Sequence, residues 1–202
     1  EFQRAGKASH EVTLQSHVMW THGHAVQAQS PDKLSVERCG YFARIGKAKE
    51  LDATYWFHFA VPTPISVAGE PLGVRSATVR LRTSADSGGT LYQEVRVVAF
   101  HVYDAEVQIG HFDGLDLKPP NWENVTVEYS LPRDLTYGLG ISVGVEFVGE
   151  RSFNPMEQGY IDFSGAGALF VDPRVMVAQK PDTVLYTAEH AGPLLPHLTD
   201  DA

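Results

Sequence analysis

The sequence predicts an all-β fold, an antiparallel β-sandwich or jelly-roll-like domain of eight or nine strands with little helix. The strongest observation is the run 137–148, in which five apolar residues alternate with small or polar ones: Leu139, Ile141, Val143, Val145 and Phe147. Five consecutive matches to a period of two fit a strand and do not fit a helix. The 18 Gly and 12 Pro favour many turns. Short runs of this kind also recur between turn residues, which is typical of a sandwich or barrel.

Nine runs predict the strands in chain order. The first five cover residues 17–29, 34–45, 55–61, 74–83 and 92–103. The third of these stops at Pro62, because proline cannot donate to a ladder, and the fifth is apolar on both faces, which indicates a central strand. The last four cover residues 107–112, 125–129, 137–148 and 160–171.

Composition and charge limit the classes of partner. Apolar residues make up 43% of the chain and charged residues 20%, so we expect a packed core. The formal net charge of −9 repels phosphate backbones and anionic lipids, and no run approaches the roughly 20 apolar residues of a membrane span. We therefore expect neither nucleic acid nor a membrane as partner. A single cysteine, Cys39, excludes an intrachain disulfide and a cysteine-rich zinc site.

Two irregular tails flank the predicted domain. We expect an N-terminal tail over residues 1–16, a β-sandwich domain over 17–172 and an irregular C-terminal tail over 173–202, where prolines recur. Tails of this kind are ordered only when something holds them, either the domain itself or a neighbouring subunit, and we expect a homo-oligomer formed through the tails. No signal peptide is visible and the chain does not begin with Met, so a soluble protein is expected in either the cytoplasm or a secreted setting.

A motif of the hydrolase type falls inside the most regular strand. Residues 140–144 match G-x-S-x-G, which exposes a nucleophilic serine at a sharp strand-to-helix turn. Here Ser142 sits in unbroken alternation with no helix after it, so we assign no catalytic residue. The small residues instead predict room for a bulky neighbour, with Trp20, Trp56 or Tyr103 as candidates.

A pair of histidines is the first candidate metal site. His22 and His24 are two residues apart, so on a strand both imidazoles point to one side and can converge on a divalent metal. A third ligand would come from His58, His101 or His111. The alternative is that the pair caps a strand or bonds neighbouring polar groups.

Spaced carboxylates offer a second candidate cation site. Asp104, His111, Asp113 and Asp116 lie close in sequence, and such oxygen ligands can hold Ca²⁺. The segment lacks the dense Asp and Asn spacing of a dedicated calcium loop, so a solvated Asp-Gly turn is the alternative.

Aromatic and acidic residues supply candidate ligand contacts. Trp122 lies in a predicted loop after Pro119 and Pro120, where a flat ring can stack on a sugar or fold back on the domain edge. Tyr103 and Asp104 sit together near the end of a predicted strand. Glu146 is the carboxylate on the small-residue face of residues 137–148, although nothing pairs it with a second carboxylate for glycoside hydrolysis.

Several short phrases resemble a bacterial all-β domain family with no assigned function. The resemblance covers roughly residues 18–150 and rests on GHAV at 23–26, WFHF at 56–59, PTP at 62–64, VYD at 102–104 and GLGISVG at 138–144. It implies a single β domain and carries over no catalytic residue.

Three functions follow from these patterns. The first is a non-catalytic binding or interaction module for carbohydrate or another small polar ligand, with Trp122, Tyr103, Asp104 and Glu146 as its contacts. The second is a structural, self-assembling protein whose tails pack on neighbouring subunits. The third is a jelly-roll metalloenzyme that uses His22 and His24. No cofactor is expected other than a Ca²⁺ ion or a histidine-bound divalent metal at these sites.

Overall fold

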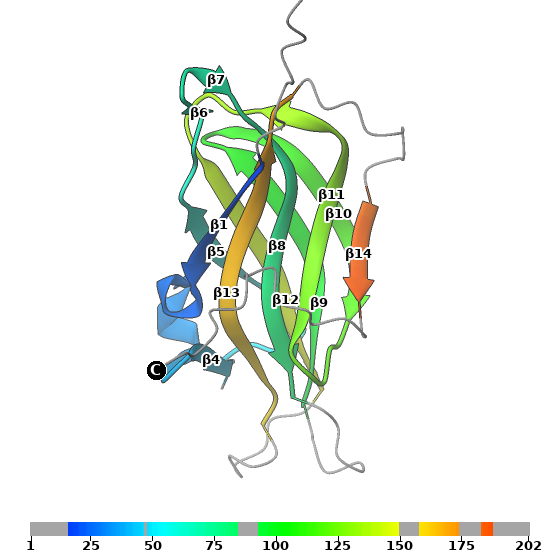
Figure 1. The fold of residues 1–202 in the computed structure, drawn as a ribbon. Helices are drawn as coiled ribbons and strands as arrows, with labels where there is room; N and C mark the ends of the chain where they lie inside the picture. The colour runs from blue at the N-terminus through cyan, green and yellow to red at the C-terminus, as the bar shows by residue number, and fades with distance from the viewer. Residues whose placement is uncertain (1–15, 47, 85–92, 150–157, 174–182, 188–202) are drawn as a thin grey trace, which may run out of the picture.

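Two antiparallel sheets face each other in a β-sandwich, which confirms the predicted fold class (Figure 1). The computed structural model describes residues 16–46, 48–84, 93–149, 158–173 and 183–187. Its strands form sheets of seven, five and two within these ranges, more than the eight or nine predicted, because two runs divide and β6, β7 and β14 lie outside the predicted runs.

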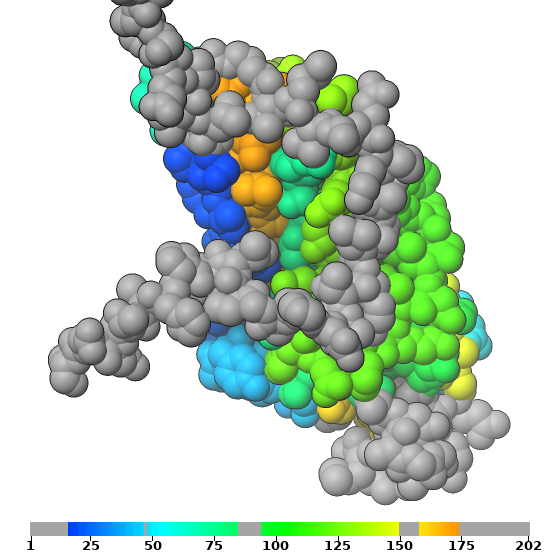
Figure 2. Space-filling view, turned by 45° about the vertical axis from the view of Figure 1, so that its right-hand side comes forward, coloured from blue at the N-terminus to red at the C-terminus, as the bar shows by residue number. Residues whose placement is uncertain are grey.

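Sheet A is the front sheet of Figure 1. Its strands in spatial order are β14 (Thr183–Thr187), β11 (Glu123–Asp134), β8 (Gly73–Thr83), β13 (Tyr160–Val171), β4 (Phe42–Gly46) and β3 (Ser35–Cys39). Strand β1 (Ser16–His22) also pairs with β13, beyond the stretch that pairs with β4. The space-filling view shows β1, β13, β8 and β11 side by side on the outer face of this sheet (Figure 2).

Sheet B lies behind sheet A. Its strands in spatial order are β10 (Val107–Leu117), β9 (Gln93–Asp104), β12 (Leu139–Gly149), β5 (Thr54–Val61) and β2 (Gln27–Ala28). A small hairpin, β6 (Ser66–Val67) and β7 (Glu70–Pro71), and two 3₁₀ turns, η1 (Gly23–Ala25) and η2 (Pro31–Lys33), complete the described elements.

The core fills the space between the sheets. All five apolar residues of the alternating run in β12 are buried, as predicted, and rings from the two sheets meet, with Phe57 and Phe59 of β5 each 5.5 Å from Phe163 of β13. Apolar side chains that lose their water in this way supply the main stabilisation of the domain.

Two predicted runs break where the chain turns. The run 17–29 divides into β1, η1 and β2, because the chain crosses from sheet A to sheet B at Gly23. The run 34–45 divides into the hairpin β3–β4, whose turn contains Gly40 at a φ of +26°. Within the C-terminal tail, β14 pairs with β11 of the same chain, while residues 1–15, 174–182 and 188–202 of the predicted tails lie outside the described residues.

An arginine pair holds a buried carboxylate on the outer face of sheet A. Asp162 of β13 is fully buried, and its carboxylate accepts hydrogen bonds from Arg44 at 2.8 and 2.9 Å and from Arg82 at 2.9 Å. The Arg44 guanidinium lies 3.9 Å from the ring centre of Tyr160, and the Arg82 guanidinium 4.7 Å from that of Trp122. These contacts tie β4, β13 and β8 together.

No helix among the described residues has the length and apolar character needed to cross a membrane.

Candidate functional site

A polar row crosses sheet B from edge to edge on its outer face. The ladder registers place Gln27 opposite His58, His58 opposite Ser142, Ser142 opposite His101, and His101 opposite His111. Residues opposite each other in a ladder share a face, so these five side chains form one row, called here the histidine row. The apolar residues directly before and after His58, Ser142 and His101 in their strands face the core instead.

An open groove of about 610 Å³ lies beside the histidine row. Gly138, just before β12, and Gly140, near its start, line it together with Gln27, His58, Ser142 and Tyr103. A Cβ atom added at Gly140 would meet nothing closer than Tyr103 Cβ at 3.9 Å, and one at Gly138 would meet nothing within 4 Å. The missing side chains of these glycines therefore leave the groove open.

The ring of Trp56 lies over a second glycine of β12, Gly144. A Cβ at Gly144 would lie 3.1 to 3.3 Å from Ala99, Thr54 and the Trp56 ring, so the indole occupies the space above this glycine. The sequence predicted room for Trp20, Trp56 or Tyr103 over the small residues. Trp56 fills it at Gly144, whereas Trp20 packs over Gly165 and Gly167 of β13 in the other sheet.

Ser142 is paired with His58. Ser142 is 8% exposed, and its Oγ lies 2.9 Å from Nδ1 of His58. Burial lowers the pKa of His58, so its imidazole is neutral at pH 7. A catalytic triad would need a carboxylate on the other ring nitrogen. Among the described residues, no carboxylate bonds to His58.

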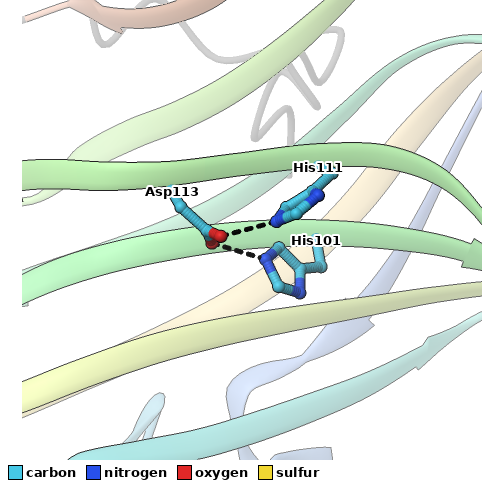
Figure 3. A group of neighbouring side chains, drawn as sticks. All are labelled: His101, His111 and Asp113. Carbon is cyan, nitrogen blue, oxygen red and sulfur yellow. Dashed lines mark hydrogen bonds and ion pairs between the residues drawn. The ribbon is translucent and has the colours of Figure 1, made fainter.

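Two histidines and one aspartate meet at the β9–β10 edge of the row. Nε2 of His101 lies 2.7 Å from Oδ1 of Asp113, and Nε2 of His111 lies 2.5 Å from Oδ2 (Figure 3). Hydrogen bonds from His101 and then His111 lower the pKa of Asp113, so the carboxylate is ionised and both Nε2 atoms donate. The two imidazole rings lie edge to face, with centres 4.6 Å apart.

Neighbouring aromatic residues orient His101. Its ring centre lies 4.7 Å from that of Trp56, and its Nδ1 lies 3.4 Å from the Tyr103 hydroxyl. Gln108 Nε2 donates to the same hydroxyl at 3.2 Å. The His101 side chain is 12% exposed, whereas those of His111 and Asp113 are each 57% exposed.

Asp104, a predicted ligand contact, bonds the protein's own backbone. Its carboxylate accepts the N–H groups of Thr136 at 2.7 Å and of Tyr137 and Gly138 at 2.9 Å. Burial opposes ionisation of Asp104, but these backbone hydrogen bonds outweigh it and lower its pKa. The aspartate thus holds the loop before β12 beside the groove.

Glu146, also predicted as a contact, is held by an arginine. Its Oε2 accepts from Arg96 at 2.8 and 3.1 Å, and its Oε1 accepts from Thr54 at 3.2 Å. Of the predicted contacts, Tyr103 lines the groove, and Glu146 shares the sheet face but not the lining.

Trp122 lies on sheet A, away from the groove. Its ring packs at 5.9 Å from Tyr41, at 5.8 Å from Phe42 and beneath the Arg82 guanidinium. This is the arrangement expected of a tryptophan that folds back on the domain edge.

His22 and His24 also lie apart from the histidine row, beside β13. The backbone N–H of His24 donates to Nδ1 of His22 at 3.2 Å, and Nε2 of His24 lies 3.3 Å from the Cys39 carbonyl oxygen. Across the residues that the structure describes, only His101, His111 and Asp113 bring three potential metal-ligating groups within 4.8 Å of one another.

The four residues of the predicted calcium cluster separate. Asp104 bonds backbone N–H groups, Asp116 lies 3.2 Å from Lys118 and 3.7 Å from Arg96, and His111 and Asp113 join His101. From the sequence, His58 and His101 were predicted only as a possible third ligand to the His22 and His24 pair, and Gln27 was not predicted as a site residue. The missing signal was strand order, since β5, β12 and β9 are neighbours only in the folded sheet.

The model of a family of unknown function (DUF6623) matches residues 14–168. The match confirms the resemblance inferred from the sequence and extends beyond it into β13. No match was found among curated proteins or among solved structures.

Proposed function

Because the chain belongs to the DUF6623 family, whose function is unknown, we propose from its geometry that it is a non-catalytic module that binds a small polar ligand, carbohydrate foremost, in the groove of sheet B. The groove of about 610 Å³ is the observation that carries the proposal. Binding sites of small molecules are concave, with a few convergent polar groups on a preformed scaffold.

The chemistry of the groove suits a hydroxyl-rich ligand. Tyr103 offers an apolar ring face together with a hydroxyl, and Gln27 offers an amide with both donors and an acceptor. His58, kept neutral by burial, carries one donor and one acceptor nitrogen and adds no charge. A neutral lining of this kind favours a sugar over a strongly charged ligand.

Filling the groove floor is the sharpest test. Gly140→Val adds a β-branched side chain whose Cβ would meet nothing closer than Tyr103 Cβ at 3.9 Å, so we expect the strand to keep its stability while the groove fills. We expect the glycan-array signal of the wild type to fall at least about tenfold in Gly140→Val and in Tyr103→Ala. Two controls, Ser76→Val on the outer face of sheet A and Trp122→Ala, should keep the signal.

The opposite pattern would contradict the proposal. Loss of binding in Trp122→Ala with retention in Gly140→Val would move the site to sheet A. Absence of any signal on a broad array would eliminate the carbohydrate version.

Self-assembly through the tails is the second candidate, with an exchange of β14 between copies as its route. Strand β14 of the C-terminal tail pairs with β11 over residues 183–187, and the same pairing made between two copies would link them. We expect light scattering to report a multimer that dissociates when residues 173–202 are deleted. A monomer at high concentration would rule this candidate out.

A further inference from the structure

We propose that His101, His111 and Asp113 form a binding site for one divalent transition-metal ion, of which Zn²⁺ is the probe. The three side chains extend from two adjacent strands toward one point on the outer face of sheet B (Figure 3). The inference rests on this cluster alone and does not depend on the proposed groove ligand.

The donor set selects the class of metal. Two imidazoles and one carboxylate suit zinc and its neighbours, whereas Ca²⁺ takes six to eight oxygen ligands. Within the described part of the chain, Asp113 alone supplies carboxylate oxygens to this cluster, because Asp104 and Asp116 bond elsewhere. Three protein ligands are also the number that leaves a zinc ion with an open fourth position.

The spacing of the donors allows a metal to enter. Ligands on a tetrahedral zinc lie about 3.3 Å apart, given bonds of about 2.0–2.2 Å. The two Nε2 atoms lie 2.7 and 2.5 Å from different carboxylate oxygens, so each histidine–aspartate pair must open by less than about 1 Å, and the three ligand atoms already lie within 4.8 Å of one another. His111 and Asp113 are 57% exposed and are free to make this adjustment, while the largely buried His101 stays in place.

The surroundings of His101 match those of a metal ligand. A ligating histidine donates its other ring N–H to a neighbouring acceptor, which sets the tautomer. Nδ1 of His101 faces the Tyr103 hydroxyl at 3.4 Å. That hydroxyl donates to Nδ1 while Nε2 carries the proton, and it accepts from Nδ1–H once Nε2 binds a metal.

The proposed metal site and the groove have one residue in common, Tyr103. Tyr103 lines the groove and contacts His101, so an ion at His101 would lie close to the groove without filling it. Its open position would face solvent on the exposed side of His111 and Asp113.

The test uses full-length protein without a histidine tag, freed of metal by a chelator and titrated with ZnCl₂ at about pH 7.5, above the usual histidine pKa of about 6.5. We expect calorimetry to report one zinc per chain. His111→Ala and Asp113→Asn should each weaken it about hundredfold or more, and Tyr103→Phe about tenfold. The absorption spectrum of bound Co²⁺ gives a second readout of the same ligands.

Matched variants make each outcome decisive. His22→Ala combined with His24→Ala should leave zinc binding unchanged, and so should Ser76→Val, which lies in β8 of sheet A, away from the cluster. Absence of zinc binding would overturn the proposal. Binding that survives His111→Ala, or that is lost in the His22 and His24 double variant, would overturn it equally. Circular dichroism checks that each variant folds, which is expected because His111 and Asp113 are exposed.

Discussion

Gly23→Ala is expected to destabilise the domain by about 3 kcal/mol and lower its melting temperature by roughly 6–12 °C. A Cβ atom at this position would lie 2.0 Å from the carbonyl oxygen of Phe163 and 2.9 Å from the carbonyl carbon of Ser164. Both atoms belong to the backbone of β13, which is held in sheet A by its ladders with β8 and β1. The crossover from β1 to β2 must therefore shift.

The effect should reach the candidate site. Residue 23 opens η1, and η1 leads directly to β2, which places Gln27 in the groove. Urea denaturation followed by intrinsic fluorescence measures the change in stability. Gly138→Ala is the matched control, since its Cβ would meet nothing within 4 Å, and we expect it to stay within about 0.5 kcal/mol of the wild type. Equal small losses in both variants would contradict the packing argument.

Asp162→Asn is expected to cost about 3–5 kcal/mol of stability. The carboxylate is fully buried and takes three hydrogen bonds from two guanidinium groups. An asparagine has one oxygen, and its NH₂ group would face an arginine donor. The variant thus leaves Arg44 and Arg82 without a counter-charge in a half-buried place, where the cost of unpaired charge is large.

A pair of the same chemistry with a less buried carboxylate provides the control. Glu146→Gln removes the carboxylate that Arg96 binds at 2.8 Å on the outer face of sheet B, where the Glu146 side chain is 22% exposed and that of Arg96 34% exposed. Such pairs contribute up to about 1 kcal/mol. Chemical denaturation of both variants should therefore show a much larger shift for Asp162→Asn. A shift no larger than that of Glu146→Gln would show that burial does not govern this pair.

The period of two predicted much of what faces the core. In β12 every apolar residue of the alternating run is buried, and the glycines and Ser142 lie on the outer face. The same regularity showed that Ser142 does not lie in a nucleophile elbow, because the residue is in the middle of a strand. Such conclusions need only local geometry, since strand side chains alternate whatever the neighbours are.

The crossing at Gly23 was not predicted, for a reason of packing. The run 17–29 has strand character on both sides of the glycine, and its alternation does not reveal that β1 and β2 belong to different sheets. The close approach to Phe163 depends on β13, which is about 140 residues later in the chain. The pairing of His58 with Ser142 likewise depends on strand order and not on local sequence.

Local sequence pattern was enough to predict an all-β domain, the core face of its most regular strand and the polar residues that could form a site. Which of these residues meet depends on strand order and register. The β9–β10 hairpin carries an irregularity between Gln108 and Gly110, and this one-residue shift sets His111 opposite His101. Without it, Gly110 would stand opposite His101 and His111 would face the core, because a slip of one residue reverses every side chain that follows.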